Sequence, residues 1–384
     1  MSWDLVRLGD LCDIARGGSP RPILQYMTTS SDGINWIKIG DANPNAKYIT
    51  STKEKIKPEG VSASRRVYPG DFLLSNSMSF GRPYILKVDG CIHDGWLVLG
   101  NISDALDNDY LYYVLCSSYV KEQFAEAARG AIVNNLNIDI ANETIIPLPP
   151  LDEQRRIATE IESKLAAVEK AKHAAMEQLA AAKALKSAYL REVFEGTDWE
   201  KVLLGDIGNV CMCKRIFKDQ TYPSGDIPFY KIGTFGGKAD AFISQDVYES
   251  YISQFPFPKK GDVLISAAGT LGRAVIYDGE PAYFQDSNIV WIDNDESKAL
   301  NSYLYHFYAT KPWTGIDGAI IARLYNDNIR EAEISLPPIE EQHRIVENLE
   351  QSYAIVTKTI TALQAQLETI NAMPAAILRQ AFSG

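Results

Sequence analysis

From Leu148 to Ile157 the chain reads Leu-Pro-Pro-Leu-Asp-Glu-Gln-Arg-Arg-Ile, and 188 positions later, from Leu336 to Ile345, it reads Leu-Pro-Pro-Ile-Glu-Glu-Gln-His-Arg-Ile. Aligned without gaps, residues 148–196 and 336–384 are identical at 20 of 49 positions. Self-similarity of this extent indicates an internal duplication. The duplicated stretches decide the fold, and the rest of the chain is interpreted around them.

Outside these tails the two halves match more loosely. Trp3 corresponds to Trp199, and Gly70-Asp71 corresponds to Gly261-Asp262, with an offset that drifts as loop insertions would make it drift. Each half therefore consists of a variable globular head and a more constant tail. The predicted division is a first head at 1–150, a first helical spacer at 151–196, a second head at 197–337 and a second helical spacer at 338–384.

The tails are predicted to be long helices. Asp152 and Glu340 follow two prolines and place an acidic residue in the first helical turn. Apolar residues then recur at alternating steps of three and four, which is the spacing of a coiled-coil seam. The residues predicted to form the helix–helix interface are Ile157, Ile161, Leu165, Val168 and Leu179 in the first tail, and Ile345, Leu349, Tyr353, Val356, Ile360, Leu363 and Leu367 in the second.

The two tails are expected to pack against each other. Small residues such as Ala175 and Ala182 continue the first seam, and alanine opposite bulky aliphatic residues allows two helices to approach closely. This complementarity favours a mixed, antiparallel pair with pseudo-two-fold symmetry over two homodimers. About 40 helical residues would span about 60 Å and keep the heads apart. Pro374 is expected to kink the second helix or to end it for a turn.

The heads are predicted to have an α+β fold. Residues 34–39 and 227–232 are aromatic and β-branched runs typical of strands, and glycine-aspartate turns introduce further strands at 71–74 and 262–265. The tyrosine-rich segment that begins at Tyr110, like the one that begins at Tyr303, is expected to open a short helix.

Composition excludes several classes of protein. The chain has 384 residues, 46% of them hydrophobic and 23% charged, which is typical of a globular protein of two to four domains. Its five cysteines form no even disulfide framework, and no apolar run approaches the roughly 20 residues needed to cross a bilayer. The beginning of the chain lacks the regions of a signal peptide, so a cytoplasmic protein that contacts no membrane is expected.

Signals of catalysis or of metal binding are absent from the sequence. His173 and His343 lie in the tails, where a solvated helix face explains them. Cys211-Met212-Cys213 has too short a spacing for a zinc knuckle, so structural cysteines are favoured. The Leu-Pro-Pro stretches lack the asparagine and the aromatic residue of an amino-methyltransferase motif, and we interpret the prolines as helix boundaries.

The net charge of −11 argues against a uniformly basic nucleic-acid binder, but positive residues cluster locally. A solvated lysine face is the alternative explanation for such clusters. Matching positions favour DNA, because lysines recur after matched strands and arginines recur after matched glycines, in loops rich in serine, threonine and asparagine. The predicted DNA-binding residues are Lys38, Arg65, Arg66, Asn76 and Arg82 in the first head, and Lys214, Arg215, Lys231, Thr270 and Arg273 in the second.

The doubled tail motif, each copy closing a head that contains a glycine-aspartate strand, resembles the DNA-specificity subunit of type I restriction-modification enzymes over the whole chain. The resemblance implies two target-recognition domains that each read half of a split, asymmetric double-stranded DNA site. It also implies that this subunit is not an enzyme and binds no cofactor. Two modification (methyltransferase) subunits would dock on the helical spacers, and restriction subunits would join further out. S-adenosylmethionine, ATP and Mg are then expected on those partner subunits.

Two other functions were weighed against DNA recognition. The first is a non-catalytic assembly scaffold whose heads bind proteins and have no DNA sequence specificity. The second is an enzyme with cryptic nuclease or methyltransferase activity, which the missing motifs disfavour. The acidic net charge departs from what a DNA reader would be expected to have, and part of the acidic surface would then face protein partners.

Overall fold

The structure is a computed structural model that describes residues 3–44, 46–76, 80–128, 135–195, 198–311, 313 and 323–382. The chain forms two compact units, the first made of Met1–Met176 with Ala365–Gly384, and the second of Glu177–Gln364. Each unit combines sheets with helices, so the predicted α+β class is confirmed. No helix in the described part of the chain is both long and apolar enough to cross a membrane.

Two helices of 44 residues each run through the tails, α5 (Leu151–Phe194) and α10 (Ile339–Phe382). Each begins directly after the double proline, as predicted. Of the two outcomes expected at Pro374, a kink or an end of the helix, the end is wrong, because α10 continues to Phe382. The loss of one backbone hydrogen bond at proline is offset there by burial of apolar side chains beyond it, including Phe382 itself.

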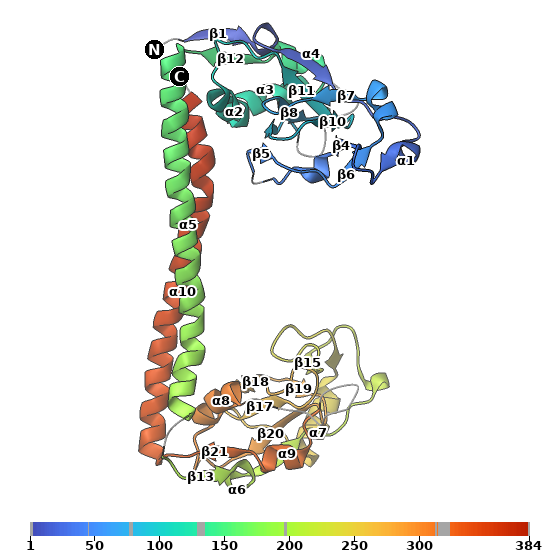
Figure 1. Ribbon diagram of the computed structural model, residues 1–384. Coiled ribbons are helices and arrows are strands. Elements are labelled where there is room, and N and C mark those ends of the chain that lie inside the picture. The colour runs from blue at the N-terminus through green and yellow to red at the C-terminus, as the bar shows by residue number, and fades with distance from the viewer. Residues whose placement is uncertain are drawn as a thin grey trace. The chain divides into compact units, whose positions relative to one another are not determined.

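The two helices are antiparallel within each unit. In the first unit Ile157 and Ile161 share a core with Phe382, whereas Val168 and Ala175 pack with Ile370. Residue numbers thus rise along α5 as they fall along α10. Figure 1 shows this pairing as the beginning of α5 beside the end of α10.

The same direction holds in the second unit, where the end of α5 meets the beginning of α10. Phe194 packs against a core that contains Val346, and the Lys186 ammonium lies 4.5 Å from the ring centroid of Tyr353. Both predicted seams are covered throughout. Ile157, Ile161, Val168, Leu349 and Val356 are buried, and the other seven predicted interface residues are half-buried.

The first head contains two five-stranded sheets. Their strand orders are β2-β11-β8-β9-β5 and β3-β6-β4-β10-β7. The first sheet consists of β2 (Asp13–Arg16), β11 (Trp96–Gly100), β8 (Phe72–Ser75), β9 (Pro83–Leu86) and β5 (Tyr48–Ile49). The second consists of β3 (Met27–Thr28), β6 (Glu54–Ile56), β4 (Ile34–Ile37), β10 (Gly90–Ile92) and β7 (Arg65–Val67).

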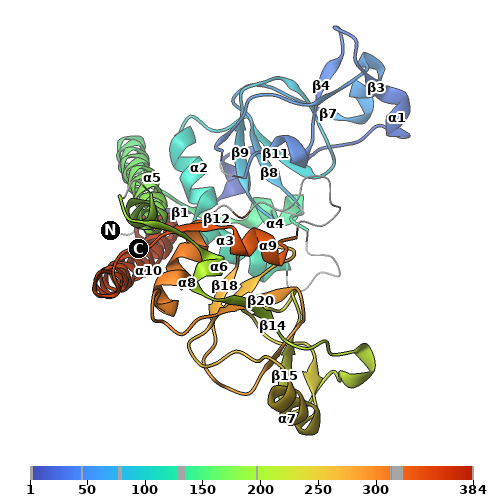
Figure 2. The same ribbon diagram turned by 90° about the horizontal axis from the view of Figure 1, so that it is seen from below.

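The first head also contains four α-helices among its described residues and a strand pair that precedes α5. Strands β1 (Asp4–Arg7) and β12 (Ile145–Leu148) pair antiparallel immediately before the tail. The head's helices are α1 (Ile23–Tyr26), α2 (Asn108–Cys116), α3 (Ser118–Ala128) and α4 (Ile138–Glu143). Figure 2 shows α2 between α5 and the sheet that holds β8 and β9, and the buried residues of α2 belong to the same core as Ile157.

In its described residues, the second head repeats this framework with fewer strands. A four-stranded sheet of order β14-β20-β17-β18 is accompanied by a three-stranded sheet of order β16-β15-β19. The bounds are β14 (Asn209–Met212), β20 (Ile289–Asp293), β17 (Val263–Ser266), β18 (Ala274–Ile276), β16 (Phe242–Ile243), β15 (Ile227–Tyr230) and β19 (Tyr283–Phe284). The pair β13 (Lys201–Leu203) and β21 (Glu333–Ser335) precedes α10, and the helices are α6 (Leu204–Ile207), α7 (Gln245–Gln254), α8 (Asn301–Thr310) and α9 (Asn326–Arg330).

Candidate functional site

One hairpin turn recurs in both heads and places the two matched arginines. The Oγ atom of Ser75 accepts the backbone N–H of Arg82 at 3.1 Å, and that of Ser266 accepts the N–H of Arg273 at 2.8 Å. Both serines are buried. Each arginine follows a glycine with positive φ, 71° at one and 74° at the other, a conformation that favours glycine. At the serine, glycine and arginine positions, the predicted correspondence of these loops is therefore a correspondence of backbone structure.

The side chains of the two arginines differ in their surroundings. The Arg82 guanidinium lies 5.7 Å from the ring centroid of Tyr84 and is half-buried. Arg273 is exposed, and its Nη1 donates to the carbonyl oxygen of Phe235 at 2.8 Å. Neither forms an ion pair with a carboxylate among the described residues. Both charges can therefore meet a phosphate or a base edge without displacing an acid.

The two matched lysines are already paired with carboxylates. Lys38 Nζ lies 2.5 Å from Glu54 Oε1, and Lys231 Nζ lies 2.7 Å from Asp240 Oδ1. The four side chains are 37–59% exposed, and ion pairs of this kind contribute about 0–1 kcal/mol. A phosphate could replace either carboxylate at small cost.

The other predicted cations are held in different ways. Arg65 donates from Nε to the Arg16 carbonyl at 2.9 Å. Arg66 pairs with Asp89, and Arg215 Nε lies 2.8 Å from Asp286 Oδ2. Lys214 Nζ lies 5.0 Å from the ring centroid of Phe255. Arg66 and Arg215 are therefore neutralised by neighbouring acids, whereas no acid pairs with Arg65 or Lys214 in the part of the chain that the structure describes.

Asn76 is placed differently from what a base-reading role requires, whereas the side chain of Thr270 is open to solvent. Asn76 is 3% exposed and its amide nitrogen donates to the Asp94 carbonyl at 2.8 Å. Its side chain therefore supports the loop and is not presented to solvent. Thr270 is exposed, and its carbonyl oxygen accepts a hydrogen bond from the Ser266 hydroxyl. Part of the serine-rich loop beyond Asn76, residues 77–79, lies outside the described residues.

The glycine-aspartate pairs are turn formers, as the sequence indicated. Asp71 Oδ2 accepts the Tyr68 N–H at 2.8 Å, and Asp262 Oδ2 accepts the Lys259 N–H at 2.7 Å. Both carboxylates close the turn that enters a central strand. They are structural residues and not candidates for DNA contact.

The tail motif contains a buried glutamine whose role the sequence did not reveal. Gln154 Nε2 donates to the carbonyl oxygens of Ala105 and Pro149, at 2.9 and 2.8 Å, and its Oε1 accepts the Asp107 N–H at 2.8 Å. The side chain is fully buried. It joins the first turn of α5 to the loop before α2. The sequence signal was that the glutamine is identical in both copies of the motif. Only the fold shows what its side chain binds.

Gln342 makes the equivalent hydrogen bonds in the second unit. Its Nε2 donates to the carbonyl oxygens of Lys298 and Pro337, both at 2.8 Å, and its Oε1 accepts the Leu300 N–H at 2.8 Å. Each head is therefore attached to its own tail by the same three bonds. The motif glutamine therefore joins each head to the first turn of its own tail helix.

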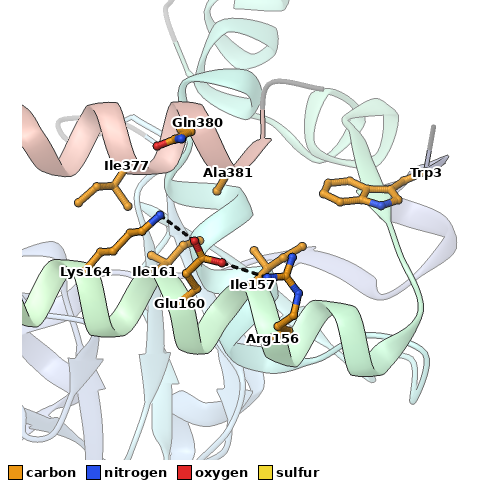
Figure 3. Close-up of a pocket in the computed structure, with 9 residues that line it drawn as sticks. All are labelled: Trp3, Arg156, Ile157, Glu160, Ile161, Lys164, Ile377, Gln380 and Ala381. Carbon is orange, nitrogen blue, oxygen red and sulfur yellow. Dashed lines mark hydrogen bonds and ion pairs between the residues drawn. The ribbon is translucent and has the colours of Figure 1, made fainter. Parts of the chain in front are cut away.

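A cavity of about 260 Å³ lies between the beginning of α5 and the end of α10 in the first unit. Figure 3 shows the Trp3 indole near the start of α5, with Arg156 and Lys164 both bonded to Glu160 along the helix. Ile157, Ile161 and Ile377 supply the apolar wall. An aromatic and aliphatic hollow with charged residues at its rim is suited to a side chain of another protein.

No cluster of three or more His, Cys, Asp or Glu side chains that could hold a metal ion occurs within the described ranges. Burial raises the pKa of Cys213 to about 12, so this thiol stays protonated and behaves as a core residue. Burial also lowers the pKa of His306 to about 4, and the Lys186 charge acts in the same direction.

Comparisons with known proteins agree with this geometry. A family model described as the type I restriction modification DNA specificity domain matches residues 1–178 and 196–369. A Haemophilus influenzae protein that carries the name of a type I restriction enzyme specificity subunit is 45% identical over 266 residues, which are 68% of this chain and 68% of that protein. The EcoBI specificity subunit of Escherichia coli is 23% identical over 420 residues, which cover 100% of this chain and 86% of that protein.

Among solved structures, the HsdS subunit from Thermoanaerobacter tengcongensis is similar with a TM-score of 0.70 and 21% sequence identity. The similarity covers 100% of this chain and 97% of that one. At this identity the likeness establishes the fold.

Proposed function

Because this chain belongs to the type I restriction modification DNA specificity family, we propose that its two heads each read one half of a split, asymmetric DNA site. Membership in the family makes the chain a non-catalytic component that recognises DNA and assembles with other restriction-modification subunits. The split site and the contacts below are our proposal.

The observation that carries the proposal is the recurrence of one backbone framework with different side chains on it. The turn that positions Arg82 is the turn that positions Arg273, yet the first arginine stacks near a tyrosine and the second binds a carbonyl. Two frameworks of the same design would approach DNA in the same way. Since their loops carry different residues, they would read different half-sites.

Affinity and specificity would come from different residues. Lys38, Lys231 and the basic residues Arg65, Lys214 and Arg215 would contact phosphates, with a strength that falls as salt rises. Arg82 and Arg273, which have no acidic partner among the described residues, are the better candidates for contacts with bases. Arg66 would assist from its pair with Asp89.

The paired helices would set the distance between the half-sites. α5 and α10 are each continuous, and each contributes to both units. The spacing would therefore be held by helices and not by a flexible linker. Two modification subunits would dock on this helix pair, and the cavity beside Trp3 would be one anchor point. S-adenosylmethionine would then be bound by those subunits, and ATP and Mg by the restriction subunits.

Lengthening both helices tests this proposal. One heptad inserted into each, after Met176 and after Gln364, adds about 10.5 Å, or about three base pairs. The assembled complex should then methylate a site whose unread gap is longer by about that amount. Three inserted heptads add about 31 Å, close to one turn of DNA, and return the second head to nearly the same face of the duplex.

The result is obtained by sequencing methylated DNA from cells that express the complex. A gap that stays unchanged in an active variant would overturn the spacing role. Sequence preference in DNA binding distinguishes the proposal from the scaffold alternative, because a scaffold bound to modification subunits would show none.

A further inference from the structure

The sheet of the first head ends on a strand that has no counterpart among the described residues of the second head. Strand β5 runs parallel to β9, with Tyr48 opposite Ile85 and Ile49 opposite Leu86. The Ile85 N–H donates to the Lys47 carbonyl and the Lys87 N–H donates to the Ile49 carbonyl, both at 2.9 Å. Ile49 is 1% exposed and packs into the core between the sheets.

The corresponding edge of the second head is open. Its sheet ends at β18, which is the counterpart of β9, among the strands that the structure describes. The register is fixed by matching bonds, because Leu86 N–H binds the Asp71 carbonyl and Tyr277 N–H binds the Asp262 carbonyl, each at 2.9 Å. Ile276 therefore corresponds to Ile85.

Backbone donors on this edge face outward. Along a strand, successive N–H groups alternate between its two neighbours. Since Tyr277 faces β17, the N–H groups of Ile276 and Asp278 face the other way, and no backbone acceptor for them is found within the described residues. The Ile276 side chain is 43% exposed, whereas Ile85 is 6% exposed and belongs to the core that contains residues of α2.

A shorter connection explains the missing strand. Residues 38–53 join β4 to β6 in the first head and contain β5, whereas only residues 231–241 join β15 to β16 in the second. This shorter loop brings Phe235 into the core, where its carbonyl accepts a bond from Arg273. Phe235 thus covers the Arg273 end of β18 and leaves the Ile276 end uncovered.

A cavity of about 310 Å³ lies beside the open edge. Its walls include Tyr230 and Phe284, whose rings stack at a centroid distance of 5.9 Å. Val275, Phe235 and Tyr277 also line it, and Asp278 and Glu280 lie on the same lining. The cavity is thus apolar inside and carries two acidic residues.

We propose that the β18 edge of the second head binds an extended segment of a partner protein, which adds as a parallel strand. Strand addition to an open sheet edge is a known mode of peptide recognition, in which backbone bonds supply affinity and pockets select side chains. The occupant carries a β-branched or aromatic residue that enters the cavity and a lysine or arginine beside it that meets Asp278 or Glu280.

The first head supplies the best example of such an occupant. Its own β5 has the aliphatic Ile49 directed into the core, and Lys47, two residues before it, pairs with Asp109 of α2. If the occupant pairs with β18 in this register, its backbone carbonyl at the position of Lys47 accepts the Ile276 N–H. Its carbonyl at the position of Ile49 accepts the Asp278 N–H. The acidic rim would repel DNA phosphates, which favours a protein partner over DNA at this edge.

A peptide with the sequence of residues 46–53, labelled with fluorescein, tests the proposal by fluorescence anisotropy against the full chain. Saturable binding with a dissociation constant below about 1 mM is expected. Ile276→Pro removes the outward N–H without touching the pairing with β17, and should weaken binding at least tenfold. Ile276→Val keeps the N–H and should leave binding within about twofold.

A change in the peptide provides a second test that does not depend on folding of the variant chain. The same peptide with Ile49→Asp should bind the unaltered chain at least tenfold more weakly, because a carboxylate would enter an apolar cavity with an acidic rim. The proposal is overturned by absence of saturable binding, by equal binding of the Ile276→Pro chain or of the Ile49→Asp peptide, or by displacement of the peptide with duplex DNA.

Discussion

The ring of Phe382, at the end of α10, packs edge-on against the ring of Tyr110 in the core of the first unit, with centroids 5.6 Å apart. Phe194, at the end of α5, holds the equivalent place against Tyr303 of the second unit at 5.1 Å. Each head therefore packs against the beginning of its own tail helix and the end of the other tail helix. This exchange makes the antiparallel pairing of the tails part of each core.

Replacing Phe382 with alanine should destabilise the first unit by about 3–5 kcal/mol, the usual cost of removing a buried phenylalanine. Phe382 is 4% exposed, so the cavity would not be solvated easily. Urea unfolding followed by tryptophan fluorescence measures the effect. Phe217→Ala is the control, since Phe217 is 58% exposed, and it should change stability by less than about 0.5 kcal/mol.

Gln342→Ala should cost about 2–4 kcal/mol, because it leaves the buried Leu300 N–H without its acceptor and two carbonyls without a donor. The measurement is the free energy of unfolding of the second unit. Gln351→Ala is the control, since this exposed glutamine of the same helix bonds only to a neighbouring glutamate side chain. Equal effects of the two changes would show that the motif glutamine is not a junction.

Arg273→Gln should weaken binding of the assembled complex to its own site by about 1–3 kcal/mol and relax the sequence preference at one position. The reason is the exposed guanidinium, which lacks a carboxylate partner among the described residues. Arg330→Gln removes an exposed arginine that pairs with Asp327 instead, and should leave specificity intact. Methylome sequencing reads both outcomes, and an unchanged motif in the Arg273 variant would count against the assignment.

The buried His306 should make the second unit less stable in mild acid. Tyr305, Tyr353 and Lys186 surround it, and its folded pKa is about 4 against about 6.5 for a free imidazole. Between those values the unfolded chain takes up a proton that the folded chain does not, so stability falls as pH is lowered from 6.5 towards 4. At pH 5 the loss should be about 2 kcal/mol relative to pH 7.

Unfolding in urea at pH 7 and pH 5 checks this sign and size. His306→Gln should reduce the difference between the two pH values, whereas His343→Gln, at an exposed position on α10, should retain the difference of the parent chain. If the His306→Gln chain kept the full difference in stability between pH 7 and pH 5, this explanation would be contradicted.

Periodic and repeated features of the sequence were sufficient for the architecture. The seam from Ile345 to Leu367 and its counterpart from Ile157 predicted two long helices, since a spacing of three and four puts apolar side chains on one helix face. The doubled motif located where each helix begins. Strands at 34–37 and 227–230 were visible because short β-branched and aromatic runs lie between turn residues.

Which polar side chains are available to a ligand was decided by the tertiary structure alone. Asn76 was predicted to read bases, but its amide nitrogen donates to the Asp94 carbonyl. Lys38 and Lys231 pair with acids that lie 16 and 9 positions away in the chain. The open edge at Ile276 likewise depends on a strand that the first head forms and that has no counterpart in the described part of the second head. Helix periodicity is local and can be found in sequence, whereas hydrogen-bond partners and sheet edges arise from contacts between distant segments, so they exist only once the chain has folded.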